Sequence, residues 1–290
     1  MRTCRSFPLI AAIALMASAV SFAAPTPIAV WLDGASSDGG NPIPSFINAK
    51  FGAGSAVLVS SAQLDTPGFL NSFKAIVVSR FDASFGSNLD PIAAANIVAY
   101  VGLPGPLQGG VALFSNDMAD NLPGGVDPLD PNLTALFGNA LGYAAASGHG
   151  YIGEFNGAAQ AVSSNSYGAT PLGLIAGSAN AVHGYGPQFV YDVGPIGSGN
   201  PIDAGVTFPF TDADQSTFLT DISGASPSNI VDIYSSARIA GEPAVLANAF
   251  VINGGPGGNK VPDSADTSIL LVIGIAALLG MSLRQKQLLS

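Results

Sequence analysis

The chain has 290 residues, a net charge of −10 at pH 7 and one cysteine, Cys4. Residues 24–263 carry 18 acidic against 5 basic side chains, which excludes nucleic acid and anionic lipid surfaces as partners of this region. The same region has no cysteine, which excludes a disulfide, a thiolate metal site and a cysteine nucleophile there.

The first 23 residues have the pattern of a secretory signal peptide. Arg2 and Arg5 precede an apolar run at residues 9–20, and small residues at Ser21 and Ala23 follow it. This pattern predicts export through the Sec translocon and cleavage by a signal peptidase after Ala23. An uncleaved N-terminal anchor is the alternative, but the apolar run is short for a membrane span.

The body, residues 24–252, begins with segments that alternate between strand and helix patterns. Apolar, β-branched runs predict four buried strands, at residues 28–32, 56–60, 75–79 and 111–114. Helix patterns lie between and after them. Strands that are apolar on both faces and separated by helices indicate a parallel sheet covered on two sides. The sequence therefore predicts an α/β fold of flavodoxin-like or Rossmann-like type, mostly parallel, with helices on both faces.

Three helices can be given expected ends. The first covers residues 43–51 and ends at Gly52, and the second begins after Asp90 and ends at Gly102. The third is expected to be capped by Asn132 and to end at Gly142. The apolar positions of the second helix are expected at Ile92, Ala95, Val98 and Ala99.

The second half of the body is rich in Gly, Asn, Ser and Pro and is harder to interpret. Short strands are predicted at residues 189–193, 206–210, 230–234 and 245–250. We expect them to continue the same sheet through long loops, with a separate small β domain as the alternative. Residues 253–260, rich in glycine, have the composition of a flexible linker.

Polar side chains follow several of the predicted strands. If the sheet is parallel, they gather along its carboxyl edge, where ligands of open α/β sheets bind. Two or three carboxylates, an Arg and a hydroxyl there could hold a sugar or a cation. Asp and Ser also simply end strands and begin turns, which is the alternative interpretation. The predicted ligand edge consists of Asp33, Arg80, Asp82, Ser115 and Asp117.

The order of elements resembles the class I glutamine amidotransferase-like fold, as topology alone. That fold carries its nucleophile on a tight turn after a central strand, where this chain has Ser115 and Asn116 and no cysteine. Its His-x-Glu pair has no match either, because His149 is followed at a distance by Glu154. A shared fold does not by itself establish a shared function. Because the motif residues are absent, no catalytic residue is predicted.

The sequence predicts no metal site and no cofactor. His149 and His183 lack a third conventional ligand, and hydrogen bonding in loops accounts for them better than zinc. Asp212, Asp214 and Asp221 could offer oxygens to calcium, but they lack the glycine and the terminal Glu of an EF-hand loop.

The last thirty residues, 261–290, combine three features. The motif Val261-Pro262-Asp263-Ser264 is followed by an uncharged apolar stretch at about residues 267–283, and then by Arg284 and Lys286. The stretch is about the shortest that crosses a hydrocarbon core of roughly 30 Å. Arg284 and Lys286 are expected to stop transfer and stay on the cytoplasmic side. A buried C-terminal core helix is the less favoured alternative, since it would need apolar surroundings on every side.

This tail resembles the PEP-CTERM class of sorting signals, closest to the variant that reads Val-Pro-Asp-Ser-Gly. The four residues 261–264 match, and Ala265 stands where that variant has Gly. The resemblance covers about a tenth of the chain. It implies that an exosortase-like transpeptidase, a membrane-embedded enzyme, cuts near the motif and passes the protein to the envelope or surface.

Together these features predict an exported protein, anchored at the inner membrane through its C-terminal helix and then released to the cell envelope, surface or extracellular space. The body is expected to be structural or ligand-binding and not an enzyme, with extracellular polysaccharide as a candidate partner. An envelope hydrolase that uses the ligand edge is the alternative function.

Overall fold

The structure is a computed structural model. It describes residues 26–32, 42–80, 91–103, 107–116, 121–125, 128–155, 175, 178–184, 189–196, 199–212, 218–223, 225–236 and 239–248. Among these residues, none of the helices qualifies as a candidate membrane span. The predicted signal peptide with Ala23, the linker and the sorting tail lie outside the described residues, including the predicted membrane helix with Arg284 and Lys286.

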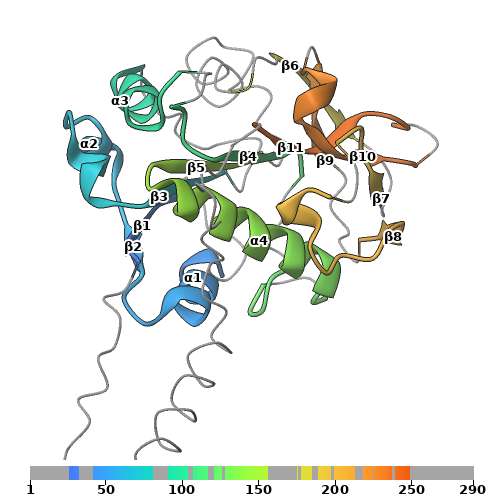
Figure 1. Cartoon of the computed structure of the whole chain (residues 1–290), viewed down its shortest axis with the longest axis horizontal. Helices are drawn as coiled ribbons and strands as arrows, with labels where there is room; N and C mark the ends of the chain where they lie inside the picture. Colours follow the sequence, from blue (N-terminus) through green and yellow to red (C-terminus); the bar gives the residue numbers. More distant parts are fainter. Residues whose placement is uncertain are drawn as a thin grey trace, which may run out of the picture.

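A nine-stranded mixed sheet forms the centre of the described part, which is therefore an α/β structure (Figure 1). Its strand order is β2-β1-β3-β5-β4-β11-β10-β7-β8. The strands are β1 (Ile28–Leu32), β2 (Ala56–Leu58), β3 (Ala75–Arg80), β4 (Val111–Phe114), β5 (Gly150–Phe155), β7 (Val190–Val193), β8 (Phe210–Thr211), β10 (Ile230–Tyr234) and β11 (Pro243–Ala247).

One half of the sheet is parallel, as the apolar runs predict. The strands β1, β2, β3, β5 and β4 pair in parallel, and β1 and β4 are almost wholly buried. The predicted strand 56–60 is only partly correct, because β2 stops at Leu58. It forms the edge of the sheet, where Val57 is 37% and Leu58 61% exposed, so it is not a buried strand.

The other half is antiparallel, so the sheet is mixed and not mostly parallel. Strand β11 pairs antiparallel with β4, and β10, β7 and β8 follow, each antiparallel to its neighbour. The strands of the second half therefore do extend the same sheet. Of the predicted strand 206–210 only Phe210 is in a strand, and β8 continues to Thr211. Two further strands, β6 (Ser178–Gly184) and β9 (Phe218–Ser223), pair with each other in a separate ribbon.

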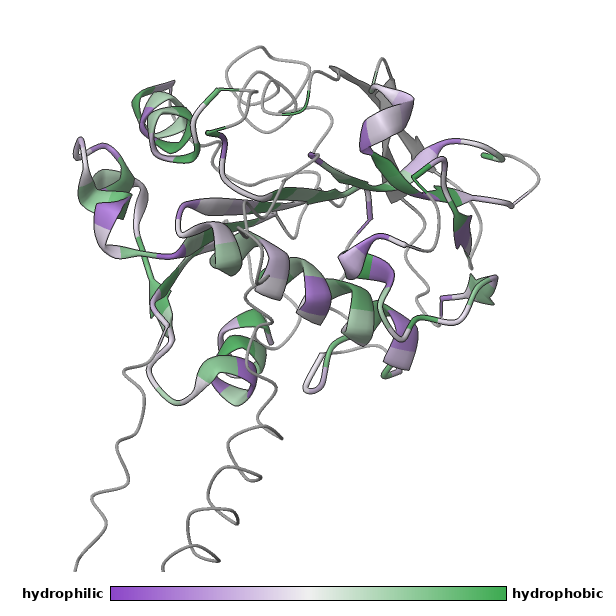
Figure 2. Cartoon of the chain, in the orientation of Figure 1, coloured by the Kyte–Doolittle hydropathy of each residue, from purple (hydrophilic) through white to green (hydrophobic). Residues whose placement is uncertain are grey.

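Four helices cover the two faces of the sheet. On one face, α1 (Ile43–Phe51) and α4 (Pro131–Ser147) pack on apolar side chains of β1, β3 and β4. On the other, α2 (Ser61–Leu64) and α3 (Pro91–Val101) pack on the alternate residues of β1 and β3. Figure 1 shows α1 and α4 below the sheet and α3 above it, and Figure 2 shows the apolar strands between them. Short 3₁₀ turns follow at η1 (Phe69–Ser72), η2 (Pro201–Asp203) and η3 (Pro227–Asn229).

Helix α1 has the predicted bounds, but the other two predictions need correction. The buried residues of α3 are Ala93, Ala94, Ile97 and Val101. The expected stripe was wrong, since Ile92 is 59% exposed and Ala95 and Ala99 are also exposed. The segment is apolar almost all round, so periodicity did not select the face. The expected cap, Asp90, lies outside the described residues.

Helix α4 begins earlier and ends later than predicted. Its N-cap is Asp130, whose carboxylate accepts hydrogen bonds from the backbone N–H groups of Asn132 and Leu133 at 2.7 and 3.1 Å. Asn132 lies inside the first turn, which Pro131 opens. The helix passes through Gly142 and ends at Gly148, whose φ of 82° is the left-handed conformation that glycine adopts without strain.

Candidate functional site

The predicted ligand edge lies largely outside the described residues. Asp33, Asp82 and Asp117 belong to segments that the structure leaves undescribed, and of Arg80 only the backbone, at the end of β3, is placed. The parallel pairing does put the carboxyl ends of β1, β3 and β4 at one edge of the sheet. Ser115 is the one predicted edge residue whose side chain can be followed.

Ser115 is the first residue after β4 and is fully buried. Its Oγ lies 2.8 Å from the Tyr234 hydroxyl and donates at 3.3 Å to the carbonyl oxygen of Ala244. Its backbone N–H donates to the same carbonyl at 3.0 Å. Ser115 therefore ties the end of β4 to β10 and to the start of β11.

Asn116 and Asp212 extend this buried polar network. The Asn116 amide donates to one Asp212 carboxylate oxygen at 3.4 Å, and the Phe189 N–H donates to the other at 3.0 Å. The side chains of Ser115, Asn116 and Asp212 are all almost fully buried. Of the residues considered for calcium, Asp212 thus binds backbone and amide donors; Asp214 and the Asp221 side chain lie outside the described residues.

The network offers Ser115 no general base among the described residues. Burial raises the pKa of the Tyr234 hydroxyl above its usual value, and burial together with the charge of Asp212 raises that of Tyr191. Both tyrosines therefore stay protonated near neutral pH and act as hydrogen-bond partners. A serine nucleophile needs an adjacent group that takes its proton, so this geometry joins strands and does not activate Ser115.

The two histidines considered for zinc belong to different parts of the structure. His149 directly precedes β5, and its ring meets that of Tyr100 edge-on at 6.3 Å. His183 belongs to β6 in the separate ribbon. Among the residues that the structure describes, no three His, Cys, Asp or Glu side chains lie close enough to hold a metal ion.

A small cavity of about 250 Å³ lies between the α2–η1 segment and α3. Thr66, Asn71, Asn96 and Tyr100 give it a polar but uncharged lining. The Asn96 amide donates to the Leu64 carbonyl at 2.8 Å, which fixes one wall of the cavity. Such a lining suits a small neutral molecule that exchanges hydrogen bonds. No pattern in the sequence indicates this cavity, because its residues come from two segments with no shared motif.

A second feature absent from the sequence prediction is a pair of buried carboxyl groups, Asp203 and Asp232. They are far apart in the sequence and neither belongs to a recognisable motif, so only the folded chain shows that both are buried. Comparison with protein-family models, with curated proteins and with solved structures finds no match.

Proposed function

We propose that this protein is exported and sorted through its C-terminal Val261-Pro262-Asp263-Ser264 motif and apolar stretch. The observation that carries the proposal is the succession of motif, apolar segment and basic pair in residues 261–290. The apolar stretch has the length of a short membrane helix, and Arg284 and Lys286 follow it as the positive-inside rule requires. The N-terminal pattern that ends at Ala23 supports the same route.

The proposed partners follow from this route: the Sec translocon, a signal peptidase and then an exosortase-like transpeptidase. The protein would first be held at the inner membrane and later reside in the envelope, at the surface or outside the cell. The acidic composition of residues 24–263 supports a body that faces water and not an anionic surface.

We further propose that the parallel half of the sheet is flavodoxin-like or Rossmann-like and that the body binds a ligand or plays a structural role. The chain leaves β1 through α1 on one face, and it leaves the neighbouring β3 through α3 on the other. In open α/β sheets such a reversal marks the crevice where ligands bind. An extracellular polysaccharide is the partner class to test first.

The hydrolase alternative has less support. Ser115 is buried and bound to Tyr234 and Ala244, and both neighbouring tyrosines favour their protonated forms. The two functions separate in one experiment, in which the purified protein and its Ser115→Ala variant are tested on a panel of glycans and esters. Turnover by the wild type that the variant lacks would support the hydrolase.

Intact-mass measurement of the protein from its native envelope tests the sorting proposal. We expect a chain that begins after Ala23 and ends near Asp263. A variant with Pro262→Ala and Asp263→Ala should keep the tail, whereas the neighbouring control Asn259→Ala should be processed normally. Recovery of an uncut 290-residue chain, freely soluble in the cytosol, would overturn the proposal.

A further inference from the structure

The cavity between the α2–η1 segment and α3 has walls that are fixed by hydrogen bonds. The Tyr100 hydroxyl donates to the carbonyl oxygen of Phe73 at 3.1 Å, and the Tyr100 ring meets the His149 ring edge-on. One turn earlier on α3, the Asn96 amide donates to the carbonyl oxygen of Leu64 at 2.8 Å. Both bonds join α3 to the segment before it, so the cavity of about 250 Å³ is formed before any ligand enters.

Several polar groups of this cavity have no partner in the described part of the chain. The bond to Leu64 uses only the amide nitrogen of Asn96, so the side-chain oxygen of Asn96 is available as an acceptor. The side chains of Asn71 and Thr66 form no hydrogen bond with another described residue. A Cβ at Gly68 would meet the Asn71 amide nitrogen at 3.3 Å, so that amide lies over the turn that leads into η1. These groups are free to exchange hydrogen bonds with a ligand.

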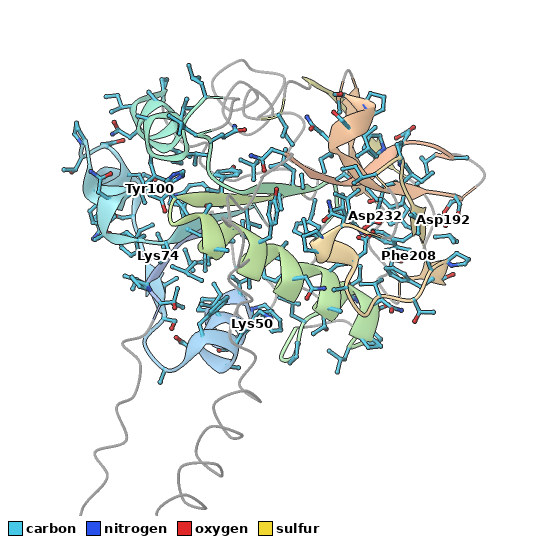
Figure 3. The ribbon with its side chains drawn as sticks, viewed as in Figure 1. Lys50, Lys74, Tyr100, Asp192, Phe208 and Asp232 are labelled. Carbon is cyan, nitrogen blue, oxygen red and sulfur yellow. The ribbon has the colours of Figure 1, made fainter. Side chains whose placement is uncertain are left out.

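The lining of the cavity carries no charge. None of the lining residues is acidic or basic, and Asp65, which precedes Thr66 in the chain, is not one of them. Burial raises the pKa of the Tyr100 hydroxyl, which therefore stays protonated near neutral pH. The carboxyl groups of Asp192 and Asp232 lie toward the other side of the molecule from Tyr100 (Figure 3). An ion that leaves water needs a partner of opposite charge, so this cavity favours a neutral ligand.

The remaining features of the lining match the chemistry of a sugar ring. An amide offers a donor and an acceptor in one plane, and neighbouring hydroxyl groups of a sugar can bond to both. The Asn71 amide and the Asn96 oxygen supply such groups, and Tyr100 adds aromatic surface against which the C–H face of a sugar packs. The volume of about 250 Å³ is below the roughly 300–1,000 Å³ of sites for drug-sized ligands, so the cavity admits one ring. Peptides are instead recognised along strand edges or in long grooves, which a cavity of this size does not provide.

We propose that the cavity is a binding site for one neutral sugar ring, which forms hydrogen bonds with Asn71 and Asn96 and packs against Tyr100. The ring would be one unit of the polysaccharide that the body is proposed to bind, so this assignment rests on the proposed function. The cavity is separate from the predicted ligand edge. Phe73, to which Tyr100 is bonded, precedes the start of β3, so Tyr100 lies toward the amino end of that strand, whereas the predicted edge lies at the carboxyl ends.

Binding of methyl glycosides to the full-length protein tests the site. The methyl glycosides of glucose, galactose and mannose are added up to about 20 mM in buffer without sugar-based detergent, and binding is followed by saturation-transfer NMR. We expect the wild type to bind at least one of them. The matched methyl glucuronide carries a negative charge and should bind less tightly. If no neutral glycoside binds, or if the glucuronide binds as tightly as the neutral sugars or more tightly, the proposal is overturned.

Two pairs of variants locate the binding. Asn71→Ala removes an exposed amide and should weaken binding about tenfold, since a donor and an acceptor are both lost. Its control, Asn132→Ala, changes an asparagine of α4 on the other face of the sheet and should bind as the wild type does. Ala99→Phe fills the cavity from an exposed position of α3 and should abolish binding. Ala95→Phe makes the same change one turn earlier, at an exposed position outside the cavity, and should not.

Unfolding midpoints close to that of the wild type verify that each variant is folded, which we expect because the changed side chains are not buried. If either Asn71→Ala or Ala99→Phe binds the glycosides like the wild type, the cavity is not the binding site and the proposal is refuted. Equal losses in Ala99→Phe and Ala95→Phe would also refute it, because the effect would then not depend on filling the cavity.

A neutral polysaccharide separates this proposal from the proposed function of the body. Dextran, a neutral glucose polymer, is tested with the same proteins by affinity electrophoresis. Retardation of the wild type that Asn71→Ala and Ala99→Phe both lose would support the cavity. Retardation that both variants keep would place the polysaccharide elsewhere on the body, which refutes the cavity and leaves the ligand-binding function standing. Glycoside binding in the cavity without retardation by dextran would support the cavity and count against this polysaccharide as the partner.

Discussion

Asn248, the last described residue, offers a test of the hydrogen bonds that hold the end of β11 against β4 and α4. Its side-chain oxygen accepts the N–H of Val111 at 2.8 Å. Its amide donates to Gln108 Oε1 at 3.0 Å and to the carbonyl oxygen of Gly109 at 2.7 Å. Tyr143 of α4 adds a hydroxyl hydrogen bond to the same side chain at 3.1 Å. One side chain thus joins the end of β11, the start of β4 and α4.

Replacing Asn248 by Ala removes these bonds and leaves their partners inside the protein. A buried hydrogen bond contributes about 1 kcal/mol net, so losing the three bonds to Val111, Gln108 and Gly109 should cost about 3 kcal/mol. For a body of this size that corresponds to a fall of about 6–12 °C in the unfolding midpoint. The loss is a large part of the roughly 5–15 kcal/mol that stabilises a typical domain.

Thermal and urea unfolding followed by circular dichroism measures the effect. Asn229→Ala is the matched control, because the Asn229 amide makes one partly buried bond, at 3.1 Å to the carbonyl oxygen of Ile175. It should cost about 1 kcal/mol or less. If Asn248→Ala lowers the free energy of unfolding by no more than the control does, the network does not hold β11, β4 and α4 together, and the reasoning from buried hydrogen bonds is wrong for this residue.

Two further pairs of variants test the corrected helix α4 and the packing beneath it. Asp130→Ala should lower the free energy of unfolding by about 1 kcal/mol, because it removes the N-cap. Asn132→Ala should lower it clearly less, because the bond from the Thr207 N–H to the Asn132 side chain, at 3.1 Å, is exposed. Equal losses in urea unfolding would argue against Asp130 as the cap. Gly142→Ala should stabilise the helix by about 0.5–1 kcal/mol, since no atom lies within 4 Å of its added Cβ. Gly150→Ala should cost about 3 kcal/mol or prevent folding, because its Cβ would meet the Ala144 carbonyl oxygen at 2.2 Å. A tolerated Gly150→Ala, judged by its unfolding midpoint, would contradict the close approach of α4 and β5.

The elements that sequence predicted well are those with a strong local pattern. The runs at β1, β3 and β4 are apolar on both faces, which only a covered sheet accommodates. Helix α1 has helical spacing between Pro42 and Gly52. Strand β5 was missed because it carries glycine at two of its six positions, and its place between β3 and β4 depends on the approach of α4 to Gly150.

The candidate site likewise combines features that a local pattern predicts with features that depend on distant residues. Sequence put Ser115 at the end of a strand, as the structure does. It could not show that Tyr234 and Ala244, more than a hundred residues later, would bind the serine and bury it. Asp203 and Asp232 were passed over entirely, because nothing local to either residue indicates that folding buries its carboxyl group.

The amino-acid sequence alone led to the proposed export and sorting, since the proposed signal peptide, linker, motif and apolar tail are continuous segments whose properties depend on composition and order. It also determined three of the parallel strands, β1, β3 and β4, for which local hydrophobicity is enough. The tertiary structure decided what depends on residues far apart in the chain: the antiparallel extension of the sheet, the buried face of α3, the neighbours of Ser115 and the burial of Asp203 and Asp232. Desolvation and hydrogen bonding act between groups that only folding brings into contact, and no local pattern encodes them.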